Sequence, residues 1–516
     1  MSLMQQAHLV CVVLYCLTLG ILAIYGIHRY VQVFLYYKHS RHTPKPAGAF
    51  ETLPRVTVQL PMYNEEFVAA RIIEAACKID YPSHLLQIQV LDDSTDNSAI
   101  LAKEACDRMR RLGHDVEYVH RVDRIGYKAG ALEQGLKTAT GDFVAIFDAD
   151  FVPNPDVIRQ TIHFFTDPNV GCVQSRWGHI NREQSILTRC QAIFLDGHFM
   201  IEHTARNRSG RFMNFNGTAG IWRKKAIEDS GGWQHDTLTE DMDLSFRSQL
   251  RGWQFIFVAD LVCPAELPPE VIAFKQQQHR WTKGSVQTAI KLLPTVLRSK
   301  LPLRVKVESW FHLTSAAVYV PAVILSLLLF PTWAMQTDIF YSTHILVTAI
   351  VMSFFGLLTC SAGTFYMLSQ QAIGRSTFKT FLMIPMLMAL GMGISMMNGL
   401  AVLEGLFGRK DTEFIRTPKY GTSAGKNDWK RRAGTFRKKS TWLPFVEIFF
   451  GLYMTACLVV ACITGRAFGT VPFLAIFAFG YLYVGLMTFH SRWLSRRAKE
   501  STPLPVPVPA AEAVAA

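Results

Sequence analysis

The sequence predicts an α/β domain inserted between transmembrane helices. Three observations predict it: long apolar segments at both ends of the 516-residue chain, a mixed segment from about 50 to 300, and β-rich runs that alternate with helix-length segments inside it. Half of the residues are hydrophobic and 18% are charged, which excludes intrinsic disorder. The ten cysteines contain no CxxC pair, so we expect a reducing compartment and neither a disulfide framework nor a zinc site.

Five segments are long and apolar enough to cross a bilayer, which takes about 20 helical residues. They are 8–28, 311–331, 344–368, 443–464 and 471–489. No basic region precedes the first and no small-residue cleavage site follows it, so residues 1–49 are expected to be an anchor and not a signal peptide. Residues 301–490 would form a transmembrane channel region, and 491–516 a basic, then Pro- and Ala-rich, disordered tail.

Basic residues predict the orientation of these segments. Arg29 and Lys38 follow the first helix, and eleven Lys or Arg lie in 407–442, so both regions and the domain between them are expected inside. The further apolar run 378–406 then cannot cross once; it fits a helix along the inner surface, or a helical hairpin. This topology accounts for much of the net charge of +13, so no nucleic-acid partner is expected.

Within the middle domain, runs at 56–60, 88–91, 116–119 and 143–147 read as strands. Helical stretches near 65–78, 97–112 and 128–139 separate them, which predicts a parallel sheet covered on both faces. Ligands of such sheets bind outside the carboxyl ends of the strands. Polar clusters follow three of these strands, at 61–65, 92–94 and 148–150, so we expect one shared crevice.

Two kinds of acid follow these strands. Asp148 and Asp150 can share a hard cation that bridges to phosphate oxygens, although a solvated turn is the alternative for an isolated DxD triplet. Asp92 and Asp93 also lie at this edge of the sheet and could bind the same ligand. Their structural alternative is an Asx turn near the start of the next helix. No GxGxxG follows a strand and no GxxxxGK[ST] is present, which disfavours dinucleotide and P-loop binding.

Four motifs in order carry a family resemblance: Asp92-Asp93-Ser94, Asp148-Ala149-Asp150, Thr239-Glu240-Asp241 and Gln277-Gln278-His279-Arg280-Trp281. They resemble the D, DxD, TED, QxxRW signature of processive family 2 glycosyltransferases, which include cellulose, hyaluronan and mannan synthases. Segments 58–65, 126–132 and 215–220 are most similar to the cellulose synthase-like A group of glucomannan synthases and their bacterial relatives. The resemblance covers about 50–300 and implies a GT-A fold.

The resemblance also implies a role for each matching residue. The catalytic base would be Asp241, with Glu240 beside it, and Asp148 and Asp150 would bind Mg²⁺ or Mn²⁺. The donor would be bound by Asp92, Tyr63, Glu65, Lys128, Asp148, Arg280 and Gln277. The acceptor would be bound by Trp281, Gly217 and Thr218. Glu240 and Trp281 also have structural alternatives. Glu240 could form a helix-capping box with Thr237, and Trp281 could be a core residue or an interfacial anchor.

The sequence therefore predicts an inverting, processive hexosyltransferase. It would polymerise hexose from a nucleotide sugar, GDP-mannose or UDP-glucose, into a β-linked glycan acceptor and pass the chain across the membrane. A non-processive enzyme that glycosylates ceramide or polyprenyl phosphate is the first alternative, and a catalytically silent scaffold the second. We expect a multi-pass protein in contact with membrane lipid, in a bacterial inner membrane or a Golgi membrane, with a cytosolic catalytic domain.

One inner segment is also informative. Residues 414–421 lie in 407–442 and resemble the gating loop of cellulose synthases, although Arg416 and Tyr420 depart from its common wording. An ordinary basic inner loop is an equal alternative.

Overall fold

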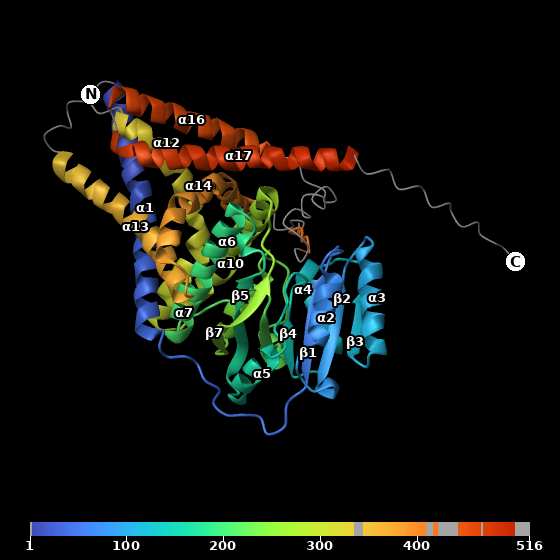
Figure 1. The fold of residues 1–516 in the computed structure, drawn as a ribbon. Coiled ribbons are helices and arrows are strands. Elements are labelled where there is room, and N and C mark those ends of the chain that lie inside the picture. The colour runs from blue at the N-terminus through green and yellow to red at the C-terminus, as the bar shows by residue number, and fades with distance from the viewer. Residues whose placement is uncertain (1–2, 335–343, 409–415, 422–441, 466–467, 501–516) are drawn as a thin grey trace.

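The computed structural model describes residues 3–334, 344–408, 416–421, 442–465 and 468–500 (Figure 1). Most of the basic segment 407–442 and the end of the tail lie outside these residues.

A seven-stranded sheet forms the centre of the middle domain, in the order β3-β2-β1-β4-β6-β5-β7. The strands are β1 (Val56–Met62), β2 (Leu86–Asp92), β3 (Asp115–His120), β4 (Phe143–Ile146), β5 (Val170–His179), β6 (Gly220–Arg223) and β7 (Gln254–Ala265). The first four pair in parallel, as predicted. The residues of β1, β2 and β4 are almost continuously buried, because helices cover both faces of the sheet.

Beyond the four predicted strands the sheet is mixed. β6 runs antiparallel to β4 and β5, whereas β7 is parallel to β5. Between β5 and β6 lie α6 (Ile186–Asp196), the π-helical turn η4 (Gly197–His203) and α7 (Thr204–Arg208). β5 ends at the carboxyl edge of the sheet, and after these helices β6 begins at that same edge. β6 must therefore run in the direction opposite to β5.

Short helices complete the domain around the sheet. α2 (Ala69–Cys77) and α3 (Ser98–Arg111) pack in one apolar cluster on one face of the sheet. α4 (Tyr127–Thr138) packs in a second apolar cluster on the opposite face. The others are α5 (Val157–Ile162), α8 (Lys224–Asp229) and α9 (Glu240–Leu250). A long helix, α10 (Val271–Arg298), then leads from the domain to α11 (Leu303–Thr314).

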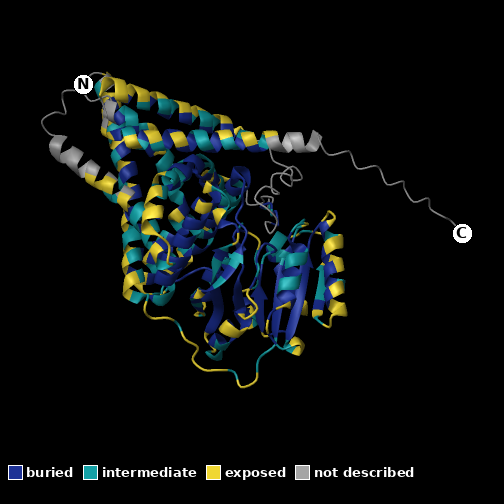
Figure 2. Ribbon diagram, viewed as in Figure 1, coloured by how far each residue is buried: buried dark blue, intermediate teal, exposed yellow. Residues whose placement is uncertain are grey.

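Long apolar helices stand beside the domain. They are α1 (Leu3–His39), α12 (Tyr319–Ala334), α13 (His344–Ala372), α14 (Thr377–Phe407), α16 (Leu443–Thr464) and α17 (Val471–Glu500). Among the described residues, five helical segments are long and apolar enough to cross a membrane: Gln5–His39, Leu303–Thr332, Thr377–Phe407, Leu443–Thr464 and Val471–Trp493. Large apolar side chains such as Leu17 and Phe449 lie exposed on their outer surface (Figure 2), as expected for a lipid-facing surface.

The apolar run 378–406 forms one unbroken helix, α14, so the helical-hairpin alternative is wrong. It packs against α10 of the middle domain and also against α12 and α17. α14 is therefore an apolar helix that connects α10 of the domain with α12 and α17.

Candidate active site

The carboxyl edge of the sheet brings most of the predicted residues to one cavity of about 110 Å³. Nine of the thirteen predicted site residues line it: Lys128, Asp148, Asp150, Gly217, Glu240, Asp241, Gln277, Arg280 and Trp281. They come from segments that are far apart in the chain, so their convergence supports one shared site over a set of separate turns.

Asp148 is held from two sides. Its backbone N–H donates to Thr218 Oγ1 at 2.8 Å, and Lys128 Nζ donates to its Oδ1 at 2.5 Å. Lys128 also donates to the Gly217 carbonyl at 2.9 Å. Burial acts to lower the pKa of Lys128, but Asp148 and Glu240 outweigh it and the pKa is raised. Lys128 is thus a fixed ammonium, and Thr218 supports Asp148 from behind instead of lining the cavity.

Asp150 and Glu65 pair with cations of segment 416–421. Lys419 Nζ lies 2.5 Å from Asp150 Oδ2, and Arg416 lies 3.1 Å from Glu65 Oε2. Burial raises the pKa of Asp150, and it raises that of Glu65 to about 7 although Arg416 and Lys419 act against it. The buried Tyr420 donates its hydroxyl to Glu270 at 2.7 Å. The described part of the gating-like segment therefore contacts Asp150 of the cavity, and Glu65 and Glu270 outside it. Phe414 and Ile415 lie outside the described residues.

The carboxylates of Asp148 and Asp150 fit a divalent cation that takes the rest of its ligands from phosphate and water. No group of three or more His, Cys, Asp or Glu that could hold a metal occurs within the described part of the chain. Mg²⁺ is commonly bound by one or two carboxylates together with substrate phosphates, so two protein ligands suffice for this chemistry.

Asp241 lies at the start of α9, where its Oδ1 accepts from the Met242 N–H at 2.8 Å. Burial and the charge of Glu240 raise its pKa to about 7, a value suited to a general base near neutral pH. The helix begins after Thr239 and has no side-chain cap, so the alternative of a capping box from Thr237 is wrong.

Gly217 allows the close approach of Asp241. Its φ is +77°, and a Cβ at this position would lie 3.0 Å from Asp241 Oδ2 and 3.4 Å from Lys128 Nζ. A side chain here would adopt a rare backbone conformation and crowd the two charged groups.

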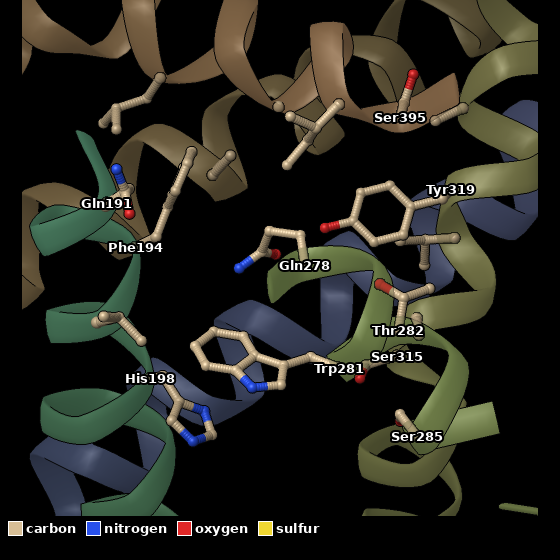
Figure 3. Close-up of a pocket in the computed structure, with 18 of the residues that line it drawn as sticks. Gln191, Phe194, His198, Gln278, Trp281, Thr282, Ser285, Ser315, Tyr319 and Ser395 are labelled. Atoms are coloured by element: carbon tan, nitrogen blue, oxygen red, sulfur yellow. The ribbon is translucent and has the colours of Figure 1, made fainter. Parts of the chain in front are cut away.

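Gln277, Arg280 and Trp281 lie at positions i, i+3 and i+4 of α10 and so share one face. All three line the cavity. Burial lowers the pKa of Arg280, and Glu240 and Asp148 act to raise it. Trp281 also lines a second cavity of about 580 Å³, which lies between the domain and the apolar helices (Figure 3).

Residues 54–284 match the family model described as "Glycosyltransferase like family 2". These residues form a family 2 glycosyltransferase domain. Its mixed seven-stranded sheet is the expected GT-A fold.

Two curated relatives of this chain come from Arabidopsis thaliana. Glucomannan 4-beta-mannosyltransferase 7 of Arabidopsis thaliana is 41% identical over 304 residues, which cover 56% of this chain and 55% of that one. Glucomannan 4-beta-mannosyltransferase 2 of the same plant is 43% identical over 274 residues, 52% of this chain and 50% of that one. The matched region thus spans about half the length of these relatives.

A solved structure is also similar. "Mannosyltransferase PcManGT from Pyrobaculum calidifontis in complex with GDP-Man and Mn2+" is 21% identical, with a TM-score of 0.49, over 70% of this chain and 99% of that chain.

Asp92 and Tyr63 lie on the same edge of the glycosyltransferase domain but outside the cavity. Asp92 is fully buried; it accepts from the Ser94 N–H at 2.9 Å and from the Tyr118 hydroxyl at 2.8 Å, so the Asx-turn alternative is confirmed. The guanidinium of Arg124 covers the Tyr63 ring, 3.3 Å from its centroid. Contact of these two residues with a nucleotide remains a prediction.

Sequence reasoning missed several residues of the cavity. Trp177 and His179 of β5 line it, as do Glu266 after β7 and Lys419. Asn216 lines both cavities and lies in segment 215–220, which the resemblance already singled out. No sequence signal marks the β5 residues, because only the pairing of β5 with β7 brings them to this edge.

Proposed function

We propose that this protein is a membrane-embedded, inverting glycosyltransferase that extends a β-1,4-linked glycan with mannose from GDP-mannose. One observation carries the proposal: Asp241 and Trp281 line both the small acidic cavity and the larger cavity beside the apolar helices. A donor in the first and an acceptor in the second would meet at the proposed base. The names of the curated relatives favour mannose and a 4-β linkage, and UDP-glucose is the second candidate donor.

The donor would bind with its diphosphate toward Asp148, Asp150 and Arg280. Asp148 and Asp150 would hold Mg²⁺ or Mn²⁺, which would offset the charge of the diphosphate. Arg280 is a buried cation of the same cavity, able to form charge-assisted hydrogen bonds to the leaving phosphate. Lys128 fixes Asp148 and the Gly217 carbonyl, so this part of the site is ordered before the donor binds.

Asp241 would accept the proton of the acceptor hydroxyl as its oxygen attacks the anomeric carbon. Electrons of the bond to the nucleoside diphosphate leave with that group, and a single displacement inverts the configuration. An α-linked donor sugar therefore gives a β-linked product. The indole of Trp281 offers a flat surface on which the acceptor sugar can stack.

The larger cavity is the proposed route of the product. Its walls come from α1, α12, α13, α14 and α17 as well as α10. We propose that the glycosyltransferase domain faces the cytosol, that segment 416–421 covers the donor cavity, and that a bacterial inner membrane is its compartment.

Product analysis tests the proposal. Vesicles containing the purified full chain are incubated with labelled GDP-mannose or UDP-glucose and Mn²⁺, and the product is digested with β-mannanase or β-glucanase. We expect a long, mannanase-sensitive product from GDP-mannose and none from the Asp241→Asn control. A lipid carrying one sugar would favour the glycolipid alternative, and no transfer from either donor would favour the scaffold.

A further inference from the structure

The larger cavity has a polar wall near Trp281. His198 from η4 and Trp281 from α10 both project into this cavity (Figure 3). η4 is a π-helical turn between α6 and α7, and such turns occur frequently at functional sites. Glu202, one turn further along, also lines the cavity.

A chain of hydrogen bonds joins Glu202, His198 and Asn216 in this wall. Asn216 Nδ2 lies 3.0 Å from His198 Nε2. An amide nitrogen can only donate, so His198 Nε2 accepts and its Nδ1 carries the hydrogen. That Nδ1 donates to Glu202 Oε2 at 2.9 Å. Asn216 Oδ1 in turn accepts from His203 Nε2.

The charges around the chain agree with this pattern. Burial acts to raise the pKa of Glu202, but Arg206 and His198 outweigh it and hold the pKa well below its ordinary value. Glu202 is therefore an ionised acceptor, and Arg206 lies 3.3 Å from it. Burial lowers the pKa of His203, which is therefore neutral and donates through one nitrogen only.

Asn216 stands where the two cavities meet, and it lines both. Its backbone N–H donates to Gln174 Oε1 at 3.0 Å, and the next residue is Gly217, which faces Asp241. One hydrogen of its amide goes to His198. For the second, no partner occurs among the described residues, and the half-buried side chain leaves it accessible from the cavity.

We propose that the Asn216 amide binds a hydroxyl of the acceptor sugar, and that His198 and Glu202 are positioning residues that hold this amide. The inference rests on the proposed function, because it needs an acceptor glycan in the larger cavity. The ligand class is a neutral sugar chain: the amide supplies hydrogen bonds without charge, while Trp281 supplies a stacking surface.

Steady-state kinetics of the full-length protein in detergent test this inference. The variants are Asn216→Ala, His198→Phe and Glu202→Gln, and β-1,4-mannohexaose is the acceptor probe. Glu202→Gln is informative because a carboxylate can only accept a hydrogen bond, whereas an amide can also donate one. The hydrogen of His198 is then no longer held on Nδ1, and Nε2 need not accept from Asn216. Glu183→Gln is the matched control, since it removes a carboxylate whose ion pairs with Arg189 and Arg375 are solvent-exposed.

Loss of one hydrogen bond should raise the KM for mannohexaose about three- to tenfold. The KM for GDP-mannose should change less than twofold, and Glu183→Gln should behave as the wild type. An unchanged acceptor KM in Asn216→Ala, or an equal rise of both KM values, would overturn the inference.

Two further results keep the test decisive. If Asn216→Ala fails to fold, Asn216→Asp keeps an oxygen for His203 but cannot donate, and it should raise the acceptor KM in the same way. If the wild type transfers no mannose to mannohexaose, the proposed function and this inference fall together. Normal wild-type transfer with a normal acceptor KM in both Asn216 variants removes this inference alone.

Discussion

Gly217→Ala tests whether the approach of Asp241 to segment 215–220 matters for turnover. The added Cβ would lie 3.0 Å from Asp241 Oδ2, where ordinary contacts are 3.4–4 Å. Gly217 also has a φ of +77°, so an alanine is strained whatever the space around it. The structure supplies a matched control: Gly210 has a φ of +68°, and its nearest neighbour for a Cβ is Arg304, at 3.9 Å.

The two substitutions share the backbone cost and differ only at the site. An L-residue in the left-handed region costs about 1–2 kcal/mol, so both variants should lose similar stability. Only at position 217 must the Asp241 carboxylate move, by about half an ångström to reach an ordinary contact. Since a misplacement of about 1 Å can cost roughly 100-fold in rate, this shift should lower kcat about tenfold.

The assay is transfer of mannose from GDP-mannose by full-length protein, with a thermal melt of each variant. We expect similar melting temperatures for the two alanine variants, a kcat about tenfold lower for Gly217→Ala, and a kcat within twofold of wild type for Gly210→Ala. Equal kcat in the two variants would refute the reasoning, because the contact with Asp241 would then have no catalytic consequence.

Four other predictions concern the same cavity. Asp241→Asn should lower kcat about 10²–10⁴-fold with little change in donor KM, and full turnover would contradict its assignment as base. Because burial and Glu240 raise the pKa of Asp241 in the free protein to about 7, the base is ionised above that pH and protonated below it; log(kcat/KM) should therefore fall with a slope near one below about pH 7, and a flat profile down to pH 5 would count against it. Chelation of divalent cations should abolish transfer, and Mn²⁺ should restore it at higher concentration in Asp148→Asn than in the wild type; a rate insensitive to chelator would exclude the metal. Lys419→Met removes the ammonium beside Asp150 and should tighten Mn²⁺ binding, as followed by electron paramagnetic resonance, whereas unchanged affinity would show that Lys419 does not compete with the cation.

The local sequence was sufficient for the first half of the fold. Continuous apolar runs such as 88–91 predict buried strands because helices must cover both faces of a parallel sheet. The local sequence was not sufficient to predict the direction of β6. That direction depends on how α6, η4 and α7 return the chain to the edge of the sheet. Nor could it decide between a hairpin and one helix for 378–406, because the two satisfy the same charge pattern.

By itself, the sequence determined which chemical groups the site contains. Asp148 and Asp150 follow from their place at a strand end, whereas Glu240, Asp241 and the QxxRW residues follow from the family resemblance; both are read from short segments. Only the tertiary structure decided what these groups meet: Lys419 reaches Asp150 across 269 positions of the chain, and Asn216 joins His198 to the wall of the larger cavity. Such contacts depend on the packing of distant elements, and no local pattern encodes that packing.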